Sequence, residues 1–331
     1  MIKLSRLFLV LVLGALLSFT VMSFAADVIT LKGASQFDDK HAFNKTMLKF
    51  EELVKKYYGK PINFVLHRTS ELGLEKDYFA YMSKGISVDY AVVAPSHMST
   101  FSKAAPLMDM PFLFRDLGHW DKVLQTDAIQ PIADDVAKKA DVMLIGYAGG
   151  GVRNIIGVKP VRNMAELKQL NIRVMGAPIQ TRIFQAIGAA PTVIAYAEVY
   201  NAIQTKVLEA CENESAGMMQ MKFYEVAPEI SLTQHAITVR PLCFSGKTFR
   251  KLPKDLQDAI IKAGKEAGKH GRDIESSEDE ERLQLLIKEG KIRTHPFTER
   301  PKLLELAEPV KKAYARELEA EAVLDRINAI K

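Results

Sequence analysis

Cysteine is scarce in this sequence of 331 residues, which contains only Cys211 and Cys243. Two cysteines are too few for a disulfide-stabilised scaffold or a cysteine-rich metal site. Each lies in an apolar run typical of a β-strand, so we predict two buried thiols. A single disulfide between them stays open, because the sequence does not show whether the two come within bonding distance.

Familiar catalytic motifs are also lacking. The sequence has no G-x-S-x-G nucleophile elbow, no Walker phosphate loop and no G-x-G-x-x-G dinucleotide motif. Its seven histidines never form a pair four residues apart, the spacing that places two zinc ligands on one face of a helix. We therefore predict no catalytic residue, no metal site and no cofactor.

A cluster of basic residues is also lacking. The chain has 45 lysines and arginines and 40 acidic residues, and the two signs are interspersed. The formal net charge is only +5, so we expect no nucleic-acid partner. With 48% apolar and 26% charged residues, the composition is that of an ordinary soluble protein. The length is sufficient for two lobes of ordinary size.

The first 25 residues differ from the rest of the chain. Lys3 and Arg6 precede an almost uninterrupted apolar run over 7–21, and small residues follow at Ser23 and Ala25, the two positions that a signal peptidase reads. This order is typical of a secretory signal peptide. We predict that residues 1–25 are removed by cleavage after Ala25. The alternative is an uncleaved membrane anchor, since the apolar run is close to the shortest that spans a bilayer.

From residue 28 onward, strand-like and helix-like segments alternate, which predicts an α/β fold. Predicted strands cover 28–33, 62–66, 90–94, 142–147 and 237–244, and predicted helices cover 43–58, 75–83, 120–125 and 129–138. Three consecutive glycines, Gly149 to Gly151, predict a turn where the backbone approaches another segment closely or where two lobes meet.

The last third of the chain is predicted to be helical. Residues 254–289 contain no proline and carry an intermittent apolar stripe. A single helix of this length would be about 54 Å long, enough to lie across two lobes. We predict that its acidic run, 275–281, is the solvated face. A final helix is predicted over 302–329.

Residues 170–213 have the clearest pattern in the chain: strand, helix, strand, helix, strand. This order predicts a parallel sheet, whose carboxyl strand ends form a ligand crevice in many α/β folds. Arg173 lies within the first strand, and Asn213 follows directly after the last. Parallel pairing would bring these two residues together from 40 positions apart.

Six stretches in order carry a resemblance to a known family. They are YAVVAPSHMSTF near 90, MPFLFRD near 110, GVRNI at 151, the segment 171–213, KFYEV at 222 and LPKDLQDAI at 252. Over residues 27 to about 320, the chain resembles the dicarboxylate-binding (DctP) type of solute-binding proteins from tripartite ATP-independent periplasmic (TRAP) transporters.

The resemblance implies an α/β, two-lobed periplasmic binding protein, type II-like, with crossing strands between the lobes and a long lobe-spanning helix. We assign 27–150 plus about 239–275 to lobe I and 151–238 plus about 276–331 to lobe II. The implied function is capture of a small organic carboxylate in the periplasm by lobe closure. Delivery would be to the small and large membrane subunits of a TRAP transporter.

The resemblance also points to the residues that bind the ligand. Arg173 matches the family's carboxylate-clamping arginine, and Asn213 matches the asparagine of its QEN motif. Arg153 resembles a second arginine that often faces the ligand, with a lobe-interface role as the alternative. Tyr196 stands where an aromatic residue lines the cleft, although a core position is equally open. A buried arginine needs a counter-charge, and Glu212 is the candidate partner of Arg173.

The sequence departs from the family at three places. It has CENE where QENP is usual, Ala197 where a serine is usual, and uncharged residues or histidine over Pro95–Met98, where some members place charged ligand contacts. The ligand class is therefore open: a dicarboxylate, keto acid, sugar acid or aromatic acid, or a zwitterion if Asp38 and Asp39 hold an amine.

Two other functions would use the same fold. A periplasmic sensor adaptor would report the ligand to a membrane receptor, and neighbouring genes would distinguish it from a transport protein. A secreted enzyme is the third alternative. The missing nucleophile and metal motifs count against an enzyme.

Overall fold

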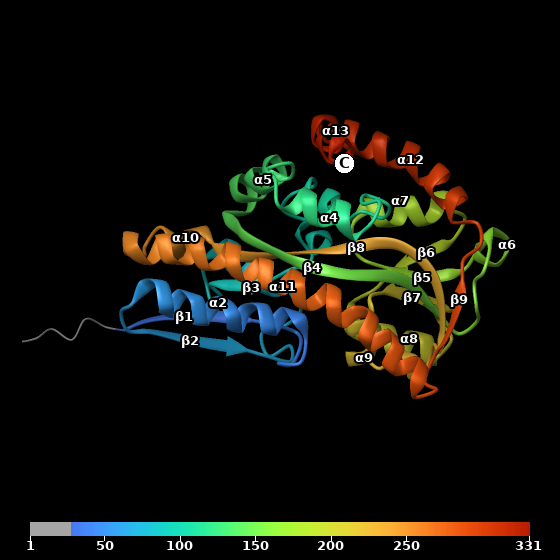
Figure 1. The fold of residues 1–331 in the computed structure, drawn as a ribbon, viewed down its shortest axis with the longest axis horizontal. Coiled ribbons are helices and arrows are strands. Elements are labelled where there is room, and N and C mark those ends of the chain that lie inside the picture. The colour runs from blue at the N-terminus through green and yellow to red at the C-terminus, as the bar shows by residue number, and fades with distance from the viewer. Residues whose placement is uncertain (1–27) are drawn as a thin grey trace, which may run out of the picture.

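The computed structural model describes residues 28–331, and the predicted signal peptide lies outside the described residues. Within 28–331 the strands join one mixed sheet, with helices on both of its faces (Figure 1). The strands are β1 Ile29–Ala34, β2 Ile62–His67, β3 Tyr90–Val92, β4 Val142–Gly157, β5 Asn171–Val174, β6 Ala190–Val193, β7 Ala210–Asn213, β8 Glu229–Ser245 and β9 Arg293–Pro296. The helices are α2 Ala42–Tyr58, α3 Glu75–Lys84, α4 Leu117–Leu124, α5 Gln130–Ala140, α6 Met164–Leu167, α7 Pro178–Ala186, α8 Val199–Gln204, α9 Ser215–Gln220, α10 Gly246–Phe249, α11 Lys254–Lys288, α12 Arg300–Glu317 and α13 Glu321–Ala329.

The order of the strands divides the sheet into two halves. The long strands β4 and β8 lie antiparallel at its centre. Beyond β8 come β3, β1 and β2, and beyond β4 come β7, β5 and β6. Pairing is parallel from β1 to both β2 and β3, and from β5 to both β6 and β7. We call the β1–β3 side lobe I and the β5–β7 side lobe II. The predicted two-lobed α/β fold with crossing strands is therefore confirmed, while the residue boundaries of the lobes remain a prediction.

The crossing strands are much longer than the sequence predicted. The predicted strands 142–147 and 237–244 are parts of β4 and β8, which have 16 and 17 residues. The predicted turn at Gly149 to Gly151 is wrong, because these glycines lie inside β4 at an irregularity of its pairing with β8. Gly149 and Gly150 have φ +117°, a conformation that glycine adopts without steric cost. The expected close approach is present, since a Cβ at Gly150 would lie 2.8 Å from the Ser276 Cβ.

The predicted long helix is confirmed as α11, which has 35 residues. Figure 1 shows it running diagonally across the sheet, beside α2 at one end and near α8 and α9 at the other. Glycines allow its backbone to touch that of β4. A Cβ at Gly264 would lie 2.6 Å from the Ile145 carbonyl oxygen, and one at Gly268 would lie 2.5 Å from the Tyr147 nitrogen.

The acidic run on α11 is only partly solvated, so the prediction for this segment is wrong at two positions. Glu275 and Asp279 are buried, one helical turn apart, on the face toward β4. Asp279 accepts hydrogen bonds from the backbone nitrogens of Val152 (2.9 Å) and Ser215 (2.8 Å). The irregular backbone of β4 leaves N–H groups that these carboxylates satisfy, which is why acidic side chains face inward here.

The C-terminal segment also differs from the prediction of one helix over 302–329. It forms α12 and α13, separated at Glu319, whose φ of +55° is incompatible with a continuous helix. Tyr314 of α12 donates to the Lys103 carbonyl, and Arg182 of α7 pairs with Glu317 at 2.5 Å. The segment therefore contacts both the 103–122 region and lobe II.

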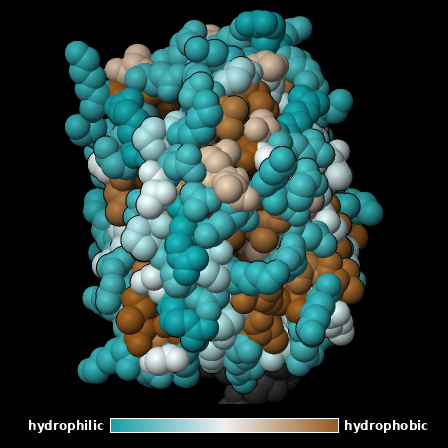
Figure 2. All heavy atoms as spheres, turned by 90° about the vertical axis from the view of Figure 1, so that its right-hand side faces the viewer, coloured by the Kyte–Doolittle hydropathy of each residue, from teal (hydrophilic) through white to brown (hydrophobic). Residues whose placement is uncertain are grey.

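The core and the surface follow the usual segregation. A large apolar cluster that includes Tyr78, Trp120 and Phe184 lies under α3, α4 and α7, and a second cluster around Phe50 lies under α2 and α11. Cys211 and Cys243 are buried free thiols, as expected, and form no disulfide. Figure 2 shows a largely hydrophilic face with several separate hydrophobic patches. None of the helices within 28–331 is long and apolar enough to cross a membrane.

Candidate ligand-binding site

A cavity of about 490 Å³ lies between the two lobes. Lobe I contributes the loop after β1, the start of α3 and the segment 96–100; lobe II contributes the ends of β5 and β6. We call this the outer cavity. A smaller inner cavity of about 20 Å³ adjoins it. The two share the lining residues Gln36, Glu75, His97, Arg173 and Tyr196.

Arg173 lies on β5, between β6 and β7, and lines both cavities. It is 2% exposed, so its side chain does not point into solvent. Its Nε donates to the Ile194 carbonyl at 3.3 Å, and its guanidinium carbon lies 5.4 Å from the Tyr196 ring centre. It forms no ion pair with any described residue. Burial lowers its pKa, and the more distant Glu212 offsets only part of that effect.

Arg153 is equally buried but fully paired. It lies on β4, where its Nε is 2.5 Å from Glu212 and its Nη1 contacts Glu214. Its Nη2 also donates to the Glu212 backbone carbonyl at 2.8 Å. Burial alone would lower its pKa, but the two carboxylates outweigh burial and raise it. Arg153 lines the inner cavity, where its guanidinium is held by protein carboxylates.

Glu212 contacts Arg153 rather than Arg173, which corrects the expected pairing. The reason is the register of the sheet: Glu212 on β7 lies opposite Ile155 of β4, so its side chain is within reach of the β4 arginine. His235 Nε2 lies 3.2 Å from the same carboxylate. Burial raises the pKa of Glu212, but Arg153 and the hydrogen bonds outweigh burial and lower it to about 2.

Asn213 and Tyr196 both line the inner cavity and bind each other. Asn213 is the last residue of β7, and its Nδ2 donates to the Tyr196 hydroxyl at 2.7 Å. Its Oδ1 accepts from the Glu214 backbone nitrogen at 3.0 Å. A Cβ at Gly217 would lie 2.5 Å from Asn213 Nδ2, so a glycine is needed beside this pair. The register β4–β7–β5 does bring Arg173 and Asn213 to one edge of the sheet.

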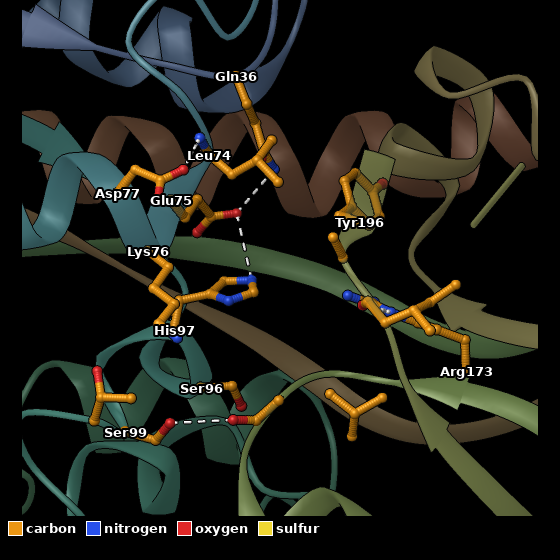
Figure 3. A pocket seen from close by; sticks show the side chains of 15 residues that line it. Gln36, Leu74, Glu75, Lys76, Asp77, Ser96, His97, Ser99, Arg173 and Tyr196 are labelled. Atoms are coloured by element: carbon orange, nitrogen blue, oxygen red, sulfur yellow. Dashed lines mark hydrogen bonds and ion pairs between the residues drawn. The ribbon is translucent and has the colours of Figure 1, made fainter. Parts of the chain in front are cut away.

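Lobe I supplies Glu75 and His97, which the sequence analysis did not single out as site residues. Figure 3 shows them facing Arg173 and Tyr196 across the outer cavity. Glu75 is 4% exposed and accepts hydrogen bonds from the Ala94 nitrogen (2.5 Å) and Gln36 Nε2 (3.0 Å). Burial raises the pKa of Glu75 to about 7 and lowers that of His97 to about 3.

The signals for these two residues in the sequence are weak. Glu75 begins a short helix, where an acidic residue is common for helix-dipole reasons alone. His97 falls in Pro95–Met98, which the sequence analysis identified as a departure from the family but did not assign to binding.

A direct contact joins the lobes beside the outer cavity. Ser99 Oγ donates to the Gly176 carbonyl at 3.1 Å, and Gln180 Nε2 donates to the Asp109 carbonyl at 3.1 Å. Ser99 and Asp109 lie in the segment after β3, whereas Gly176 and Gln180 follow β5. The lobes are therefore in contact at this edge of the cavity.

The structure does not support an amine site at Asp38 and Asp39, and it shows no metal site among the described residues. Asp39 binds Arg68 at 2.6 Å, and neither Asp38 nor Asp39 lines the two cavities. Across residues 28–331, no three histidine, cysteine, aspartate or glutamate side chains are grouped as metal ligands would be.

These features define a class of protein. A buried arginine that has no carboxylate partner within the described part of the chain faces a cavity formed by two lobes, and two crossing strands connect those lobes. This is the arrangement of a binding protein for a small anion.

Comparison with known proteins gives the family. Residues 34–319 match the model of the bacterial extracellular solute-binding protein family 7 (DctP), and the chain belongs to this family, the solute-binding proteins of TRAP transporters. The family is one of periplasmic substrate-binding transport proteins, as the sequence resemblance predicted.

Individual relatives agree. The chain is 49% identical over 320 residues to a solute-binding protein of Sulfitobacter sp. strain NAS-14.1, covering 96% of this chain and 97% of that one. It is 27% identical to the 2,3-diketo-L-gulonate-binding periplasmic protein YiaO of Escherichia coli K12, covering 87% of each. Among solved structures, a TRAP periplasmic solute-binding protein of Sulfitobacter sp. NAS-14.1 with bound α-D-taluronate superposes with a TM-score of 0.89 at 50% identity, covering 91% of this chain and 97% of that one.

Proposed function

We propose that this protein captures a sugar acid in the periplasm and delivers it to the small and large membrane subunits of a TRAP transporter. The observation that carries the proposal is Arg173: a buried guanidinium that faces a cavity and has no carboxylate partner among the described residues. A ligand carboxylate would supply the missing charge and bind two N–H groups at once.

The lining opposite Arg173 supports a hydroxylated ligand. Glu75, Gln36 and Ser96 place a carboxylate, an amide and a hydroxyl on the lobe I wall. Such groups can form further hydrogen bonds with sugar hydroxyls, whereas an aromatic ring would offer them no hydrogen-bonding partner. The relative at 50% identity holds a uronate, and YiaO is named for a keto sugar acid, which supports the same ligand class.

The predicted site residues take different parts in this proposal. Arg173 binds the ligand carboxylate. Asn213 and Tyr196 complete the polar wall beside it, and Arg153 lines the inner cavity while Glu212 neutralises its charge. We assign Glu75 and His97 to the sugar hydroxyls.

The proposal includes the cellular setting and the lobe boundaries. Residues 1–25 act as a signal peptide that is cleaved after Ala25, and the lobes comprise 27–150 plus about 239–275 and 151–238 plus about 276–331. Ligand binding favours the closed arrangement because only that arrangement adds contacts from both lobes. No covalent chemistry takes place, and no catalytic residue or cofactor is assigned.

Isothermal titration calorimetry with D-taluronate, D-galacturonate and D-glucuronate tests the proposal. We expect at least one of them to bind, and Arg173→Met to lose at least about 2 kcal/mol of binding free energy, the scale of a hydrogen bond to a charged group. Arg162→Met is the matched control, since the Arg162 side chain is 47% exposed and remote from the cavity. Unchanged binding by Arg173→Met would refute the assignment, and failure of all sugar acids to bind would refute the ligand class.

A further inference from the structure

Arg240 is a third buried arginine at the site, and its hydrogen bonding is incomplete. It lies on β8, is 3% exposed and lines the inner cavity. Its Nη2 lies 3.3 Å from Glu214, and its guanidinium carbon lies 5.4 Å from the centre of the Phe43 ring. Its Nε and Nη1 are buried and have no acceptor among residues 28–331. Leaving donors of a charged group unpaired in a protein interior costs free energy, so these N–H groups call for a partner.

The partner must be small and must come from the outer cavity. The inner cavity has a volume of about 20 Å³, which is close to the space that one water-sized group needs. Gln36, Glu75 and Arg173 border both cavities, so a ligand in the outer cavity can extend one group into the inner one. A single oxygen atom of the ligand fits this space.

Charge separates the role of Arg240 from that of Arg173. The Arg240 guanidinium already lies beside the Glu214 carboxylate, whereas Arg173 forms no ion pair with a described residue. A ligand carboxylate therefore gains more binding free energy beside Arg173 than beside Arg240. An uncharged oxygen satisfies the free N–H groups of Arg240 without adding a second negative charge beside Glu214.

Two contacts hold Arg240 in place for this task. The Phe43 ring lies under the guanidinium, and Glu214 fixes Nη2. Because Glu214 also binds Arg153, it is itself held on a second side. A donor held in this way selects by geometry, since it loses little conformational freedom when the ligand binds.

We propose that Arg240 is a specificity-determining residue, which donates to a hydroxyl, ring or carbonyl oxygen of a ligand whose carboxylate lies on Arg173. The site then selects hydroxylated monocarboxylic acids over acids without that oxygen and over dicarboxylic acids. This inference rests on the proposed function, because it assumes that a sugar acid occupies the outer cavity.

The test compares Arg240→Met with the wild type by calorimetry, using D-galacturonate, cyclohexanecarboxylate and galactarate. Methionine keeps an apolar contact with Phe43 but has no N–H donor. We expect the wild type to bind D-galacturonate most tightly and the variant to bind it at least about tenfold more weakly, which corresponds to one lost hydrogen bond of a charged donor. The affinity for cyclohexanecarboxylate, where the wild type binds it, should change by less than about threefold.

Several outcomes would overturn the inference. Unchanged affinity of Arg240→Met for D-galacturonate would do so, as would an equal loss for both monocarboxylates or tighter wild-type binding of galactarate. If the methionine variant does not fold, Arg240→Lys decides: it keeps the charge beside Glu214 but lacks the planar set of donors, so it should also lose D-galacturonate affinity. If no sugar acid binds the wild type at all, the proposed function fails instead. If the wild type binds a sugar acid and Arg173→Met weakens that binding while Arg240→Met does not, only the inference about Arg240 fails.

Discussion

The inner and outer cavities are lined by arginines that are buried to the same degree but bound differently. On the inner side, Arg153 is enclosed by Glu212 and Glu214, and its nitrogens are occupied. Arg173, which lines both cavities, has a backbone carbonyl and an aromatic ring as neighbours and forms no ion pair with any residue of 28–331. The arginines lie on β4 and β5, the two strands that flank β7.

The difference teaches that burial alone does not identify a binding residue. A buried arginine with two carboxylates is a structural element that joins strands, because its charge is already balanced. A buried arginine that faces a cavity without a counter-ion costs folding free energy, and a ligand can repay that cost. The protein places one of each on β4 and β5, two strands of the same sheet.

The largest expected effect is on stability, and it comes from replacing Arg153, the arginine that is paired with two carboxylates. Arg153→Met leaves the Glu212 and Glu214 carboxylates buried without their main partner, so we expect the free energy of unfolding to fall by about 3–5 kcal/mol. Urea denaturation followed by circular dichroism measures the change. Arg173→Met is the matched variant, and its free energy of unfolding should stay within about 1 kcal/mol of the wild type, because removal of an unpaired buried charge offsets the lost hydrogen bond. Equal losses in the two variants would contradict the distinction.

The next effect concerns two buried carboxylates, Glu75 and Glu212. Burial raises the pKa of Glu75 to about 7 in the folded protein, against 4.5 for a free side chain. Between these pH values the unfolded chain has lost the proton and the folded protein retains it, so the wild type loses stability as pH rises from about 4.5 to 7. Glu75→Gln does not titrate, and relative to the wild type it should gain about 3 kcal/mol over this range.

Glu212 should show the opposite slope. Its pKa is lowered to about 2 by Arg153 and the hydrogen bonds it accepts, despite burial, so its stabilising effect is present above pH 4.5 and is lost as pH falls below that value. Urea denaturation of Glu75→Gln, Glu212→Gln and the wild type at several pH values from 3.5 to 8 measures both slopes. For each variant, the free energy of unfolding relative to the wild type is plotted against pH. If the two plots had slopes of the same sign, the contacts described here would not determine the pKa values of Glu75 and Glu212.

The smallest expected effect is on ligand binding, and it comes from removing the Tyr196 hydroxyl. Tyr196→Phe keeps the ring beside Arg173 but removes the hydroxyl that accepts from Asn213 at 2.7 Å. We expect a loss of about 1 kcal/mol in binding of the sugar acid, the scale of one neutral hydrogen bond. Calorimetry measures this loss, and Tyr200→Phe serves as control, since Tyr200 binds Glu225 outside both cavities. A loss as large as that of Arg173→Met would mean that the hydroxyl itself is the main anchor.

Local patterns in the sequence predicted most of the helices and strands. The long helix 254–289 was predicted within one residue at its end, because proline-free periodic segments depend on local interactions. The glycines of β4 were misread as a turn, since three glycines signal a break unless the partner strand and α11 are known. Glu275 and Asp279 look solvated in the sequence, and only the unpaired N–H groups of β4 and α9 explain their burial.

The candidate site could be predicted only in part. Arg173 and Asn213 lie at the cavities because they stand near the carboxyl ends of β5 and β7, and Tyr196 because it follows the end of β6. The sequence pattern can locate such strand ends. The partners of Arg153 depend on the register of β4 against β7, and the presence of Glu75 depends on how lobe I faces lobe II. Such long-range pairings leave no local pattern.

Helix α11 and strand β4 touch backbone to backbone where they cross, and this restricts which sequences can adopt the fold. A Cβ at Gly264 or Gly268 would overlap atoms of the strand backbone, and no choice of rotamer relieves the overlap because the backbone fixes the Cβ. A library of random variants should keep many folded members with changes at Val65, which is 43% exposed on the edge strand β2, and few with changes at the two glycines. Tolerance to mutation in this protein is thus set by the crossing of two segments that are more than a hundred residues apart in the chain.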